Sequence, residues 1–75
     1  MSNTIENYVA DLGKEITKLA QEVRCNRKAR DDEFEKGRQF ALYEILSLMR
    51  QQAVVFGLDE SEIGLTGVNV EEFLI

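Results

Sequence analysis

Apolar residues recur at intervals of three and four through the first third of the chain, and no proline interrupts the sequence anywhere. On a helix that turns 100° per residue, these residues fall in one stripe about 120° wide, opposite a face of polar residues and alanine. The stripe comprises Ile5, Tyr8, Val9, Leu12, Ile16, Leu19, Ala20 and Val23. The pattern predicts an amphipathic α-helix that buries one side against another element.

This first helix has a clear start signal and a weaker stop signal. Asn3 followed by Glu6 resembles a capping box, which places the start near Thr4. Asn26 is a residue type that ends helices, so we expect the helix to span about 4–26.

The next stretch, Arg24–Arg38, changes character, with six bases and four acids. Continuing the helix would place Arg27 and Arg30 on the apolar stripe, so we interpret this stretch as a corner between two helices. Asp32 followed by Glu35 offers a start signal for the second helix. One continuous helix is the alternative, because neither glycine nor proline forces a break at the corner.

The second predicted helix, at about 32–56, is apolar on two sides. Its main face comprises Phe34, Ala41, Leu42, Ile45, Leu48, Met49, Ala53 and Phe56. A strip on the reverse side comprises Phe40, Tyr43 and Val54, with Ser47 between them. One neighbouring helix cannot cover both sides, so either the C-terminal tail or a second copy of the chain must pack there. We predict an interface between two copies formed by Phe34, Phe40, Tyr43, Ser47 and Val54.

Residues 57–75 repeat a short motif after a glycine, Gly57, that is well suited to end the second helix. In both Asp59–Glu62 and Asn69–Glu72, a capping residue is followed three positions later by a glutamate. The motif predicts an ordered tail with two short helical turns. We expect its apolar residues to cover one side of the second helix: Leu58, Ile63, Leu65, Val68, Phe73 and Leu74.

These features predict an all-α fold in a single domain at 1–75, with an antiparallel helical hairpin at 1–56 and the ordered tail at 57–75. A chain of this size buries only about 60% of the surface of its unfolded form, so it is marginally stable alone. A single cysteine excludes an internal disulfide, and without histidine the usual zinc site is not available. We therefore expect two hairpins to dimerise into a four-helix bundle.

No group of residues forms a catalytic, cofactor-binding or metal-binding constellation. The carboxylate pairs lie at predicted helix starts, which stabilise the ionised form, whereas acid–base catalysis needs a raised pKa. Cys25 has cationic neighbours, but no histidine is present to act as its base. The segment Asp59–Gly64 resembles the start of a calcium loop, but Ile63 and Val70 stand where oxygen ligands are required. We expect a non-enzymatic protein without cofactor or metal.

The one basic cluster comprises Arg24, Arg27, Lys28 and Arg30. It is a candidate contact for an anionic group. The favoured interpretation is a solvated corner, because acidic residues follow at once and no aromatic residues are interleaved for base stacking.

The net charge of −5, from 14 acids and 9 bases, disfavours non-specific attraction to nucleic acid or anionic lipid. No signal peptide or membrane-spanning stretch is recognisable, and the single thiol fits a reducing cytoplasm. The expected function is that of a cytoplasmic interaction or adaptor module that acts as a homodimer with an unknown protein partner. The alternatives are a nucleic-acid-associated regulator that uses the basic corner and an acidic inhibitor of a basic partner.

Overall fold

The computed structural model describes residues 3–30 and 33–74, and for residues 27–30 it describes the backbone alone. Over these residues the chain forms two long α-helices, two short 3-10 helices and no strand. Helix α1 spans Thr4–Arg30 and α2 spans Glu33–Phe56. The tail contains η1 at Glu60–Ile63 and η2 at Val70–Leu74. The predicted all-α hairpin with two short helical turns is therefore confirmed.

Helix α1 begins where the sequence predicts and ends later. The Asn3 side-chain oxygen accepts a hydrogen bond from the Ile5 N–H at 2.8 Å, which caps the first turn. The predicted end near residue 26 was wrong, because the helix continues to Arg30. Arginine, lysine and alanine favour helix, and no glycine or proline opposes them in this stretch, so a change in charge pattern alone does not end the helix.

The two helices pack along seams whose residues alternate in spacing between four and three. This spacing gives a repeat of 3.5 residues, as in a coiled coil. The seam of α1 comprises Val9, Gly13, Ile16, Ala20 and Val23, all buried or half-buried. The seam of α2 comprises Glu35, Gln39, Leu42, Leu46, Met49 and Ala53, also buried or half-buried.

The apolar stripes predicted as core are only partly buried. Leu42 and Ala53 of the main face of the second helix are buried, and so is Leu46, which does not belong to that face. Four large side chains of that face are exposed: Phe34, Ile45, Leu48 and Phe56. Four residues of the first stripe are exposed too: Ile5, Tyr8, Leu12 and Leu19. In each helix, the buried seam lies to one side of the apolar stripe that the sequence predicts. The tail packs on only one side of the hairpin, and residues on the other side of each stripe stay exposed.

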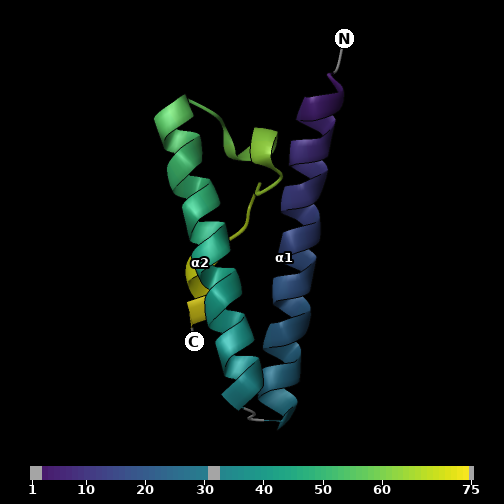
Figure 1. The fold of residues 1–75 in the computed structure, drawn as a ribbon, viewed down its shortest axis with the longest axis vertical. Helices are drawn as coiled ribbons and strands as arrows, with labels where there is room; N and C mark the ends of the chain where they lie inside the picture. The colour runs from purple at the N-terminus through teal and green to yellow at the C-terminus, as the bar shows by residue number, and fades with distance from the viewer. Residues whose placement is uncertain (1–2, 31–32, 75) are drawn as a thin grey trace.

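The tail completes the core on that side. Figure 1 shows η1 between the two helices and η2 beside α2, and both short helices contact both long ones. Among the described residues, four of the nine buried apolar ones belong to the tail: Ile63, Leu65, Val70 and Phe73. The buried Gln39 side chain donates a hydrogen bond to the Phe73 carbonyl oxygen at 2.7 Å. Leu58 and Leu74, which were expected to help cover the second helix, are exposed.

A glycine pair allows η1 to approach α1 at the level of the backbone. A Cβ atom on Gly13 would overlap the carbonyl oxygen of Ile63, and a Cβ atom on Gly64 would overlap the carbonyl oxygen of Ala10. Gly64 also ends η1 in the left-handed region, with φ at 75°, which only glycine adopts at little cost. Any side chain at either position would therefore push η1 away from α1.

The hairpin is open at one end. Figure 1 shows that the helices approach each other near their connected ends and diverge towards the other end, where η1 lies between them. The molecule is elongated, with principal extents of 45 × 21 × 18 Å. Its radius of gyration is 13.3 Å, against about 11 Å for a compact chain of this length.

The glycine pair gives a direct stability test. We expect Gly13→Ala to lower the free energy of unfolding by about 1–3 kcal/mol through overpacking, although alanine favours helix over glycine by about 1 kcal/mol. Gly37 is the matched control, because it is a helical glycine where an added Cβ atom would meet no other described segment within 4 Å. Gly37→Ala should raise stability by up to about 1 kcal/mol in urea unfolding. The same sign of change for both variants would contradict the close approach.

Candidate interaction surface

The tail is fastened to one side of the hairpin by charged side chains as well as by the core. Arg50 of α2 donates two hydrogen bonds to the Glu71 carboxylate, at 2.7 and 3.3 Å. Arg24 of α1 pairs with Glu72 at 3.6 Å. The tail therefore reaches both helices on this side and covers it.

The other side of the hairpin is uncovered and carries large apolar side chains from both helices. We call this surface the open face and define it as Tyr8, Leu12 and Leu19 of α1 with Phe34, Ala41, Ile45 and Leu48 of α2. All seven residues are exposed; Phe34, Tyr8 and Leu48 are 70%, 65% and 55% exposed. Large apolar residues gathered on one surface are a signature of an interaction site.

The positions of these residues relative to the two seams explain why they share one face. In an antiparallel pair of helices, the positions flanking the seam on one side of the first helix adjoin the equivalent positions of the second. Arg24 and Arg50, both paired with the tail, flank their seams on the same side. Leu12, Leu19 and Ile45 flank the seams on the opposite side. The open face is thus the side of the hairpin opposite the tail.

Four of the five residues predicted to form a dimer interface lie outside the open face. Phe40 is 51% exposed and stacks on Tyr43, with ring centroids 6.1 Å apart. Val54 is exposed, whereas Tyr43 and Ser47 are half-buried. The fifth residue, Phe34, belongs to the open face, where the Arg38 guanidinium lies 6.0 Å from its ring centroid. The predicted residues therefore divide between two sides of α2.

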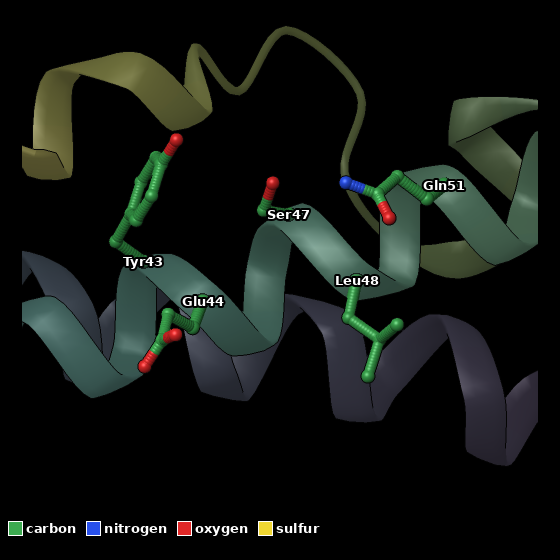
Figure 2. A pocket seen from close by; sticks show the side chains of 5 residues that line it. All are labelled: Tyr43, Glu44, Ser47, Leu48 and Gln51. Atoms are coloured by element: carbon green, nitrogen blue, oxygen red, sulfur yellow. The ribbon is translucent and has the colours of Figure 1, made fainter.

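A hollow of about 400 Å³ lies along α2 beside these residues. It is lined by Tyr43, Glu44, Ser47, Leu48 and Gln51. Figure 2 shows Tyr43, Ser47 and Gln51 extending from the side of α2 nearer the tail, with Leu48 and Glu44 on the other side. The hollow therefore runs across the outer surface of α2 and does not enter the core.

The predicted anion contacts are placed only in part. Arg24 is half-buried and paired with Glu72, so its charge serves the docking of the tail. The side chains of Arg27, Lys28 and Arg30 lie outside the described residues. Asp32, which was proposed to start the second helix, also lies outside the described residues. Glu35, the second residue of that start signal, is buried and pairs with Arg38 at 3.1 Å.

The described residues offer little else that points to chemistry. Cys25 is exposed and not in a disulfide. Within residues 3–30 and 33–74, no three side chains of the types that bind metals lie together as a metal site would require. Neither described helix combines the length and apolar character needed to cross a membrane.

Sequence reasoning placed Phe34 in an interface but missed the open face, because it assigned the other six residues to packing within the hairpin. A signal was nevertheless present. Ile5, Leu12 and Leu19 repeat every seven residues, and so do Phe34, Ala41 and Leu48. A seven-residue repeat beside a buried seam indicates a second packing surface on the same helix.

No protein family, curated protein or solved structure matches this chain. The open face is the surface that combines apolar character with exposure on both helices.

The bidentate pair between Arg50 and Glu71 predicts a pH dependence of tail docking. Hydrogen bonds from Arg50 lower the pKa of Glu71 below its ordinary value. A carboxylate whose pKa is lowered on folding contributes stability above its unfolded pKa and loses it as the pH falls through the folded pKa. We therefore expect the melting temperature to fall less steeply on acidification in Glu71→Gln than in the wild type, as measured by circular dichroism.

The control for this experiment is Glu44→Gln. Glu44 is an exposed carboxylate that points away from the tail. Its removal should leave the pH dependence of the melting temperature unchanged. If the melting temperature of the wild type fell with pH as steeply as that of Glu71→Gln and no more, the pair between Arg50 and Glu71 would not hold the tail.

Proposed function

We propose that this protein is a non-enzymatic protein–protein interaction module that acts as a homodimer, in which two copies meet through their open faces. The observation that carries the proposal is the row of exposed apolar side chains opposite the tail, with Leu19 on α1 and Ile45 and Leu48 on α2. Two hairpins that pack through such faces give a four-helix bundle, a common architecture for paired helical hairpins.

The exposed area supports a second copy as the occupant. The accessible surface is 5325 Å², whereas a compact monomer of this size exposes about 4,700 Å². The excess, about 600 Å², approaches the roughly 800 Å² that each partner buries in a standard interface. Because the same face is present on both copies, a two-fold axis makes the surface its own complement.

The charge pattern of the open face is also consistent with self-association. Its seven members are apolar or aromatic. Two charged residues lie among them, Glu15 and Arg38, and each is paired within its own helix, with Lys18 and with Glu35. A nucleic-acid-associated regulator is the second candidate, because Arg24 of the basic corner is engaged with the tail.

Sedimentation equilibrium tests the proposal. We expect the wild type to be a dimer at micromolar concentration. The double variant Leu19→Glu, Ile45→Glu should dissociate at least about a hundredfold more readily, because it places unpaired charges in the interface. Its far-ultraviolet circular dichroism should stay helical, because both residues are exposed in one copy.

The matched control carries the same change on the reverse strip, as Phe40→Glu, Val54→Glu. Both of these residues are exposed as well. This variant should remain a dimer if the open face is the interface. Loss of the dimer in the control alone would assign the interface to the reverse strip, and a monomeric wild type would overturn the homodimer.

A further inference from the structure

A second hollow lies at the open end of the hairpin, between the first turns of α1 and the segment that follows α2. Its volume is about 370 Å³, within the range of binding pockets for small groups. It is lined by Ile5, Glu6, Val9, Ala10, Leu58 and Glu62. Four of these six residues are apolar, and both charged residues are acidic.

The position of η1 explains why this hollow exists. The alternation of four and three places the next member of the α1 seam three residues before Val9, at Glu6, which lines the hollow beside Ile5. Because η1 lies between the helices at this end, no long helix of the described chain packs opposite these two turns. Ile5 is consequently 71% exposed and Leu58 is 41% exposed. The hollow is thus an unfilled continuation of a helix-packing seam.

The charged residues that line the hollow are both acidic. Glu6 and Glu62 line it, and Asp59 and Glu60 are neighbours of Glu62 in the sequence. The Glu62 carboxylate accepts a hydrogen bond from the Asp59 N–H at 2.9 Å, which fixes it beside the hollow. An apolar hollow with an acidic border complements an apolar side chain that has a cation close by.

We propose that this hollow binds an amphipathic basic helix of a partner protein. The partner inserts a large apolar side chain among Ile5, Val9 and Leu58, and a lysine or arginine one turn away pairs with Glu6 or Glu62. A helix is the fitting occupant, because Glu6 and Val9 lie on the α1 seam, whose later residues pack against α2. The residues that line the hollow are not among the seven residues of the open face, although Ile5 lies in the same row of α1 as Leu12 and Leu19.

A synthetic peptide of about 14 residues tests this proposal, with leucines on one helical face and lysines beside them. Isothermal titration should give micromolar binding, and amide shifts in NMR spectra should centre on Ile5, Val9 and Leu58. Two control peptides, one with serine for leucine and one with glutamate for lysine, should bind at least about tenfold more weakly.

Protein variants locate the binding site. Ile5→Ser should weaken binding at least about fivefold, whereas Val55→Ser, at a residue of similar exposure on α2, should not change it. Glu6→Gln should weaken binding about two- to fivefold in low salt and reduce its salt dependence.

Three outcomes would overturn the proposal: no binding, equal binding of the glutamate peptide, or amide shifts centred on Leu19 and Ile45. The variant Leu19→Glu, Ile45→Glu separates this site from the proposed dimer. It should keep its affinity for the basic peptide even where it sediments as a monomer. Loss of peptide binding in this variant would instead assign the peptide to the open face.

Discussion

The backbone contact between Gly13 and Gly64 is the constraint on which the arrangement of this molecule depends. A helix normally keeps other backbone segments at the distance set by its side chains. Glycine removes that barrier at one position in α1, and a second glycine removes it on the approaching loop. The tail can therefore enter between the helices, where Ile63 and Leu65 are buried.

Two further features of the molecule follow from this entry. The tail occupies one side of the hairpin, so the opposite side keeps its apolar residues exposed. Entry of η1 at one end also holds the helices apart there, so α2 does not pack against the first turns of α1. The open face and the hollow lined by Glu6 and Glu62 thus share one structural cause, although no residue belongs to both.

The helices and the tail turns were predictable because their signals are local. Asn3 caps the first turn of α1, and the Glu62 carboxylate accepts the Asp59 N–H as a capping glutamate should. Gly57 ends α2 in the left-handed region, with the Leu58 N–H donating to the Ala53 carbonyl at 2.7 Å. Each of these interactions joins residues within five positions of one another. Local sequence is sufficient to identify such features.

The identity of the buried faces was less predictable, because it depends on contacts between distant residues. A glutamine in a helix is expected at the surface, yet Gln39 is buried. Its side chain donates a hydrogen bond to the carbonyl oxygen of Phe73, 34 positions away. The same docking selects Leu46 for the core and leaves Ile45 exposed. Phe34 was predicted for an interface and lies on the open face, whereas Leu19 was assigned to the core. An apolar periodicity alone does not distinguish burial within a chain from burial between chains.

The share of the core supplied by η1 and η2 also determines when this chain can fold during synthesis. The ribosome produces α1 and α2 first, and at that stage the hairpin lacks Ile63, Leu65, Val70 and Phe73. A nascent hairpin in this state exposes apolar side chains on both of its sides, together with the Gln39 amide that is buried in the complete fold. Cooperative folding must wait until residue 73 has left the ribosome, so the nascent helices depend on their own solubility, or on a chaperone, until then.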